Sequence, residues 1–248
     1  NGTLVVEGNR IAAVGAAGAV EIPAGAHRID ASGHTIMPGI IDVHQHGGQG
    51  FGEIIPRQNR SNYAQLAFGV TTIHNPSAGT NQIMAAAEMA RAGRVVAPRI
   101  FSTGTILYGA TSGSTAEVNS LEDARTHIRR MAAVGAISVK SYNQPRRDQR
   151  QQILQAAREE GLQVFLEGGA LFHHNMNQVQ DGHTSVEHSL PLTAVYDDVL
   201  QFWGAAGTGY TPTLTVAFGG RNAEAYWYEA TNVWENERLQ AFHPPLTL

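Results

Sequence analysis

The sequence contains no cysteine, so this chain can form no disulfide and offers no thiolate to a metal. Charged residues make up only 15% of the 248 residues and the formal net charge is −4, which leaves no basic footprint for nucleic acid. No apolar run approaches the roughly 18 residues that a membrane-spanning helix needs, so neither nucleic acid nor membrane is expected as a partner. His, Asp, Glu and modified Lys remain as possible metal ligands, and the cellular compartment stays open.

The first 37 residues differ in pattern from the rest of the chain. In TLVVEGNRIAAVG two β-patterned runs flank Gly8-Asn9, and in HRIDASGHTIMPG two further runs flank Ala31-Ser32-Gly33, which predicts two hairpins. A unit of this size is too small to be stable alone. We therefore predict that residues 1–37 form part of a small β-sandwich and that residues 38–248 form a second domain.

From Pro38 onward short apolar runs alternate with helical stretches. The predicted strands are GIIDVHQH, VTTIHNP, PRIFSTG, AISVKSY, LQVFLEGG, TSVEHSLP and GYTPTLTV. Ser120 with Asp123 marks one helix start, and several helices end at a glycine, namely Gly69, Gly93, Gly135, Gly161 and Gly207. Such alternation predicts right-handed βαβ units and a parallel sheet.

Seven strands fit a (β/α)₈ TIM-type barrel that lacks its eighth strand better than a doubly wound sheet. No G-x-G-x-x-G fingerprint follows the first strand, which weakens the dinucleotide-binding alternative. The chain is expected to end in a helix, NVWENERLQAF, after strand seven. Two open sheet edges would seek partners, so we expect a homo-oligomer or poor solubility.

Polar side chains stand at the carboxyl ends of the predicted strands, where such barrels carry their chemistry. These are His44 and His46 of the first strand, His74 of the second, Lys140 of the fourth, Glu167 of the fifth and His188 of the sixth. Residues i and i+2 of a strand point to the same side, so both imidazoles of the first pair share a face. Imidazoles with anionic oxygens suit a divalent cation, with Zn²⁺ as the leading candidate and an open position for water.

Each of these residues also has an ordinary explanation. Lys140 could extend from the strand end to water, Glu167 could cap a helix, and His188 could be a core histidine with satisfied hydrogen bonds. Alternatively, a buried Lys140 could lose its proton and add CO₂, which would give a carbamate bridge between two metals. His74 is expected to be structural or to support a ligand.

Further histidines lie in the stretch between strands five and six, which we expect to be irregular. Exposure in a loop is the expectation for His173, His174 and His183, although His174 could line a substrate pocket. After strand four, Tyr142 and Arg146 could receive a substrate carboxylate, with a solvated surface as the competing interpretation.

PGIIDVHQH, the strand-four lysine and SVEHS together resemble the amidohydrolase superfamily. The closest similarity is to its Xaa-Pro dipeptidase and imidazolonepropionase-like branch, and VKSYNQPRR, LEGGALFHHN and DGHTSVEHSLP resemble members whose hydrolase domain follows a TolB-like propeller. The start of the chain resembles the flanking β-sandwich of the superfamily.

The resemblance implies a centre of one or two metals. His44 and His46 would bind the more buried metal, Lys140 would bridge as a carboxylated lysine, and His188 would bind the second metal. The superfamily usually has a histidine where this chain has Glu167, and its strand-eight aspartate, which deprotonates the hydrolytic water, has no counterpart here.

The leading hypothesis is a metal-dependent hydrolase that cleaves C–N bonds of a small molecule or short peptide by metal-hydroxide attack. Lys140, Glu167 and His188 would be its catalytic residues. The alternative is a truncated, non-catalytic metal- or ligand-binding remnant, which the incomplete barrel and Glu167 motivate. A metal-free barrel that binds phosphorylated ligands is disfavoured, because no glycine-rich phosphate loop follows the late strands.

Overall fold

The computed structural model describes residues 1–52, 54–110, 113, 115–169, 171–213 and 228–242. The chain divides into two compact units, Asn1–Pro38 and Gly39–Leu248. In the first unit, β1 (Gly2–Glu7) and β2 (Arg10–Ala16) form an antiparallel hairpin, as the pattern around Gly8-Asn9 predicts.

The second predicted hairpin is wrong, because residues 17–39 contain no strand. Local hydrogen bonds form a turn there instead: the N–H of Ser32 donates to Asp30 Oδ1 at 2.9 Å, and the N–H of His34 donates to the carbonyl of Ala31 at 3.0 Å. Polar side chains that bond to their own backbone compete with a strand ladder, and the four-residue runs HRID and HTIM are too short to win that competition.

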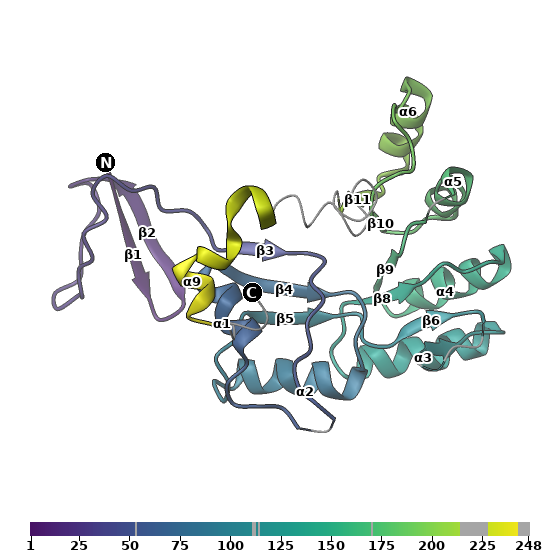
Figure 1. Cartoon of the computed structure of the whole chain (residues 1–248), viewed down its shortest axis with the longest axis horizontal. Helices are drawn as coiled ribbons and strands as arrows, with labels where there is room; N and C mark the ends of the chain where they lie inside the picture. Colours follow the sequence, from purple (N-terminus) through teal and green to yellow (C-terminus); the bar gives the residue numbers. More distant parts are fainter. Residues whose placement is uncertain (53, 111–112, 114, 170, 214–227, 243–248) are drawn as a thin grey trace. The chain divides into compact units, whose positions relative to one another are not determined.

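The second unit is built from parallel strands in two sheets (Figure 1). The three-stranded sheet has the order β3 (Ile40–Asp42), β4 (Val70–Asn75), β5 (Arg99–Ser102). The six-stranded sheet has the order β11 (Gly209–Thr211), β10 (Ser185–Glu187), β9 (Gln163–Leu166), β8 (Ser138–Ser141), β6 (Ile106–Tyr108), β7 (Thr115–Glu117). Every pairing between these strands is parallel.

All seven predicted strands are present, as β3, β4, β5, β8, β9, β10 and β11. The strands β6 and β7 were not predicted, because each has only three residues and they flank a run of Gly, Ser and Thr. The last residues of the predicted seventh strand, 214–216, lie outside the described residues. The parallel α/β fold is thus confirmed, whereas the incomplete TIM-type barrel, the partial sandwich at the start of the chain and the homo-oligomer stay predictions.

Helices follow the strands as expected (Figure 1). They are α1 (Arg60–Ala67), α2 (Thr80–Arg91), α3 (Leu121–Ala133), α4 (Arg147–Glu159), α5 (Phe172–Asp181) and α6 (Asp197–Ala206). The Ser120 hydroxyl accepts the Asp123 N–H at 3.1 Å, and all five predicted end glycines have positive φ. No helix in the described part of the chain is long and apolar enough to cross a membrane.

Two helix predictions need correction. The stretch after β9 is not irregular but forms α5, which buries Asn175, Gln178 and Val179. The predicted terminal helix consists of short pieces, a 3₁₀ turn η1 (Val233–Glu235) and α9 (Glu237–Gln240). Asn236 interrupts it with extended backbone and accepts the Leu239 N–H at 3.1 Å, which is the behaviour of a capping residue.

The largest core cluster lies between β8 and helices α3 and α4. Val139 of β8 packs there with Ile128, Met131 and Ile153, all almost completely buried. Because side chains alternate along a strand, Ser138 and Lys140 face away from these helices. The packing of Val139 therefore points Lys140 to the opposite side of the sheet, toward the polar residues at the strand ends.

Candidate active site

The five residues predicted as metal ligands come together in the folded chain. His44 and His46 follow β3, Lys140 lies in β8, Glu167 follows β9 and His188 follows β10. The ring of His44 lies 5.0 Å from that of His46 and 4.9 Å from that of His188, measured between centroids. Four parallel strands thus bring these side chains to one place at their carboxyl ends.

The two histidines after β3 face each other through one nitrogen each. His44 Nε2 lies 3.1 Å from His46 Nε2. Burial lowers the pKa of His46 and the neighbouring His44 lowers it further, so the neutral imidazole, which can donate a lone pair to a metal, is favoured. Two nitrogens bound to one tetrahedral zinc at about 2.0–2.1 Å would lie roughly 3.3 Å apart, close to the observed separation.

Glu167 links the lysine and the sixth-strand histidine. Its Oε1 accepts a hydrogen bond from His188 Nε2 at 3.0 Å, and its Oε2 forms an ion pair with Lys140 Nζ. Burial raises the pKa of Glu167, but the hydrogen bond from His188 and the charge of Lys140 outweigh burial and hold that pKa at about 2. Glu167 is therefore an ionised carboxylate throughout the neutral range.

Lys140 is completely buried, and apart from its ion pair with Glu167, its Nζ has no aligned hydrogen bond among the described residues. A buried charged amine with a single partner is costly. Burial disfavours the charged form of a lysine in general, and the neutral amine is the form that can add CO₂ to become a carbamate.

These side chains fit a divalent cation in chemistry, although they are not arranged as a finished metal site. Within the described residues, no group of three or more His, Asp or Glu side chains is already placed to hold an ion. The nitrogen and oxygen atoms contact each other in pairs instead: His44 with His46, and Glu167 with His188 and Lys140. The spacing of the two Nε2 atoms fits one ion, and the remaining ligands would have to turn toward it.

Glu187 is a member of this cluster that the sequence analysis missed. It is 1% exposed, and its Oε2 lies 2.6 Å from His44 Nδ1. The hydroxyl of Ser185 donates to its Oε1 at 2.6 Å. Its position directly before His188 in SVEHS argued against a place in the site, because neighbours in a regular strand point to opposite faces.

His74 has a structural place beside the cluster, one of its two predicted roles. Its Nδ1 donates to the carbonyl of Val43 at 3.2 Å, and its Nε2 contacts Ser138 Oγ at 2.8 Å. Burial lowers the pKa of His74, so the ring is held neutral. The neutral ring connects the loop after β3 with β8.

The predicted substrate residues lie in different places. Tyr142 is half-buried, and burial followed by the negative charge of Glu167 raises its pKa, which places it near the cluster. His174 lies on α5 with its Nε2 3.0 Å from Gln178 Nε2, and Arg146 is exposed, with Nε 3.3 Å from Asp148. Neither His174 nor Arg146 has a described contact with the five predicted ligands.

Of the three histidines that were expected to be exposed in a loop, only His173 is exposed, and it lies in a helix. His183 is 2% exposed and its Nδ1 donates to the carbonyl of Gln178 at 2.9 Å. Both His173 and His174 belong to α5. The loop interpretation fails because the stretch is helical and packs Val179 against Leu166 of β9 and Val186 of β10.

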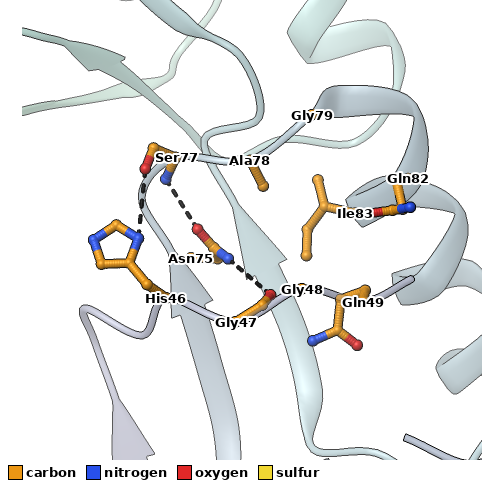
Figure 2. Close-up of a pocket in the computed structure, with 10 residues that line it drawn as sticks. All are labelled: His46, Gly47, Gly48, Gln49, Asn75, Ser77, Ala78, Gly79, Gln82 and Ile83. Carbon is orange, nitrogen blue, oxygen red and sulfur yellow. Dashed lines mark hydrogen bonds between the residues drawn. The ribbon is translucent and has the colours of Figure 1, made fainter. Parts of the chain in front are cut away.

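A pocket of about 230 Å³ adjoins His46 (Figure 2). Apart from His46 it is lined by small or uncharged residues: Gly47, Gly48, Gln49, Asn75, Ser77, Ala78, Gly79, Gln82 and Ile83. Hydrogen bonds hold its wall, since Asn75 Oδ1 accepts the Ser77 N–H at 3.0 Å and Asn75 Nδ2 donates to the Gly47 carbonyl at 3.4 Å. The pocket can hold a small uncharged group next to His46.

Comparison with known proteins found no matching family model. An imidazolonepropionase of Anaeromyxobacter dehalogenans (strain 2CP-C) is 39% identical over 105 residues, which cover 38% of this chain and 25% of that protein. The crystal structure of an amidohydrolase matches with a TM-score of 0.67 and 21% identity, over 86% of this chain and 61% of that one. A Xaa-Pro dipeptidase with methionine bound in its active site matches with a TM-score of 0.62 and 18% identity, over 98% of this chain and 66% of that one.

These matches confirm the predicted resemblance. The chain spans a quarter of the curated relative and less than two thirds of either solved structure. At identities near 20%, the solved structures show a shared fold. Any assignment of the relatives' activities to this chain therefore depends on the residues at its own strand ends.

Proposed function

We propose that this chain belongs to the amidohydrolase superfamily and that it is a hydrolase that uses Zn²⁺ or a similar divalent cation to cleave C–N bonds in small amides, cyclic amides or short peptides. The observation that supports it is the contact network of His44, His46, Lys140, Glu167 and His188 at the carboxyl ends of four strands. A bound cation would activate water and polarise the scissile carbonyl.

Each residue of the cluster would have its own role. His44 and His46 offer paired nitrogens to the cation, and Glu167 and His188 offer the next oxygen and nitrogen. A carboxylate with a pKa near 2 hardly holds a proton at neutral pH and is therefore a poor general base. We therefore propose that Glu167 binds the cation and balances its charge. The resemblance gives the proton transfer to a strand-eight aspartate, and we assign that step to none of the described residues.

Carboxylation of Lys140 would change the charge balance of the site. The unmodified ammonium neutralises Glu167, whereas a carbamate would place a second anion beside that carboxylate. Two adjacent anions in a buried site require a cation between them. We therefore propose that carboxylation of Lys140 and metal binding occur together, with Lys140 unmodified in the metal-free protein.

The pocket beside His46 would receive part of the substrate. Its lining contains no carboxylate, ammonium or guanidinium group, so it favours an uncharged group. Tyr142, which follows β8 and lies near Glu167, would contact the substrate from a second side. A neutral amide of modest size fits this arrangement better than a substrate with charges at both ends.

Metal analysis combined with an amidase screen tests the proposal. The purified protein, loaded with zinc and dialysed, should retain one or two ions per chain, and the His44→Ala/His46→Ala double variant should lose them. His173→Ala, which removes an exposed histidine from the same unit, is the matched control and should retain the metal. Unchanged stoichiometry in the double variant would refute the ligand assignment.

A non-catalytic, metal- or ligand-binding remnant is the second candidate, favoured by the direct Lys140–Glu167 contact at a position where the resemblance expects a histidine. The same experiment separates the two. Bound zinc without turnover of any amide, N-acyl amino acid or dipeptide in the screen supports the remnant, and turnover excludes it.

A further inference from the structure

Glu187 stands behind His44 on the side away from His46. Its carboxylate oxygen lies 2.6 Å from His44 Nδ1, while His44 Nε2 faces His46. The two residues are separated by 143 positions in the sequence, so only the fold joins them. Glu187 is as buried as a core residue, and His44 has only 6% of its side chain exposed.

The carboxylate is itself held in position. Its second oxygen accepts the hydroxyl of Ser185 at 2.6 Å, two residues earlier on the same face of β10. Both carboxylate oxygens therefore have a short hydrogen bond, and Glu187 has little freedom to rotate. A rigid acceptor of this kind can select one form of the imidazole that it contacts.

We propose that Glu187 is a positioning residue that fixes His44 in the Nδ1–H tautomer and so directs the Nε2 lone pair toward His46. A carboxylate oxygen accepts hydrogen bonds, and its 2.6 Å contact with Nδ1 places the hydrogen of that contact on Nδ1. Nε2 is then free to act as a ligand. Carboxylates behind metal-binding histidines fix tautomer and ring orientation in this way in general.

The proposal also assigns the hydrogen between the two rings. With a lone pair on His44 Nε2, the 3.1 Å contact needs a hydrogen on His46 Nε2 in the metal-free protein. A cation would displace that hydrogen and bind both nitrogens. This inference rests on the proposed function only in that last step, because the tautomer of His44 can be measured without metal.

Nuclear magnetic resonance of the metal-free chain with ¹⁵N-labelled histidine, at pH 8, tests the tautomer. The His44 ring, identified by the loss of its signals in His44→Ala, should carry its hydrogen on Nδ1. Glu187→Ala should give a mixture of tautomers, whereas Glu187→Gln, which keeps an acceptor oxygen, should preserve the wild-type tautomer. An Nε2–H tautomer of His44 in the wild-type protein would overturn the proposal.

Zinc affinity provides the second measurement. Loss of a partner behind a ligand typically weakens metal binding by about 10–100-fold, so we expect this loss in Glu187→Ala, a smaller one in Glu187→Gln, and the smallest in Ser185→Ala, which keeps the carboxylate. Circular dichroism shows whether each variant is folded. If Glu187→Ala is folded but keeps both tautomer and affinity, the proposal is wrong. If the tautomers follow the prediction and the wild-type chain binds no zinc, the role of Glu187 stands and the proposed function fails.

Discussion

Gly168 should be the least replaceable glycine in the candidate site. It follows Glu167 with φ +71°, and a Cβ at this position would lie 1.9 Å from the carbonyl oxygen of Glu187 and 3.1 Å from its carbonyl carbon. Both obstacles are backbone atoms, so no side-chain rotation relieves them. The ends of β9 and β10 would have to separate by about an ångström to admit a methyl group.

The magnitude of this effect can be isolated with a matched glycine. Gly161 ends α4 with φ +69°, and a Cβ there meets nothing within 4 Å. Gly161→Ala therefore carries only the cost of a left-handed alanine, about 1–2 kcal/mol. Gly168→Ala carries the same cost plus overpacking, typically about 1–3 kcal/mol, so its total destabilisation should be about 2–5 kcal/mol.

Urea unfolding followed by far-UV circular dichroism measures both variants, and equal slopes with denaturant would show that the free energies can be compared. Gly168→Ala should also weaken zinc binding, because the shift moves the carboxylates of Glu167 and Glu187, while Gly161→Ala should not. If the two variants lose the same stability and bind zinc equally, the close approach of β9 and β10 is not real.

Three further predictions test the fold and the pocket. Burial lowers the pKa of His183 from 6.5 to about 4; the unfolded chain therefore binds a proton between these pH values that the folded chain does not, so stability should rise by about 3 kcal/mol between pH 4 and 6.5, and His183→Gln should flatten that part of a pH series of urea titrations. Ser120→Ala removes the cap of α3 and should cost about 1 kcal/mol in thermal unfolding, and an unchanged midpoint would contradict the cap. Gly79→Leu adds a side chain to the pocket wall at an ordinary φ of −60° with open space at Cβ; it should leave the unfolding midpoint within a few degrees of the wild type but raise KM for amides found in the screen, and an unchanged KM would exclude the pocket from substrate binding.

The strands were predictable because each apolar run ends in a polar residue or a turn. Their C-terminal ends therefore stand out in the sequence, and parallel pairing brings such ends to one edge. Helix α5 was harder to predict, because FHHNMNQVQD has only three apolar residues, Phe172, Met176 and Val179, although their i, i+4, i+7 spacing suits a helix. The side chains that it buries include Asn175 and Asp181, which find their hydrogen-bond partners outside the helix.

The burial of Asp181 shows why tertiary contacts decide this helix. Its carboxylate accepts hydrogen bonds from Arg150 Nε at 2.5 Å and Arg147 Nε at 2.8 Å, both on α4. Burial raises the pKa of Asp181, but these partners outweigh it and lower the pKa overall. An acid that ends one helix and is held by two arginines of another stabilises both, and no local pattern shows this pairing.

The five predicted ligands could be found from position alone, whereas Glu187 could not. In a regular strand, neighbours such as Glu187 and His188 point to opposite faces, so only one of them would be expected in the site. Both contact His44 nevertheless, Glu187 through a 2.6 Å hydrogen bond and His188 with ring centroids 4.9 Å apart. The regular alternation must therefore break between them.

The break is visible in the backbone of His188, which has φ +68°. Among the described residues, only Asn232 is another non-glycine with positive φ. Asparagine and histidine both adopt this conformation more often than most side chains, for which it costs about 1–2 kcal/mol. At His188 it is held by the N–H bond to the Thr211 carbonyl at 2.9 Å and the ring contact with Glu167. A glycine would avoid the strain and lose the imidazole. The positive φ lets one short segment place both a nitrogen and a carboxylate beside His44, which is the arrangement that the proposed metal site needs.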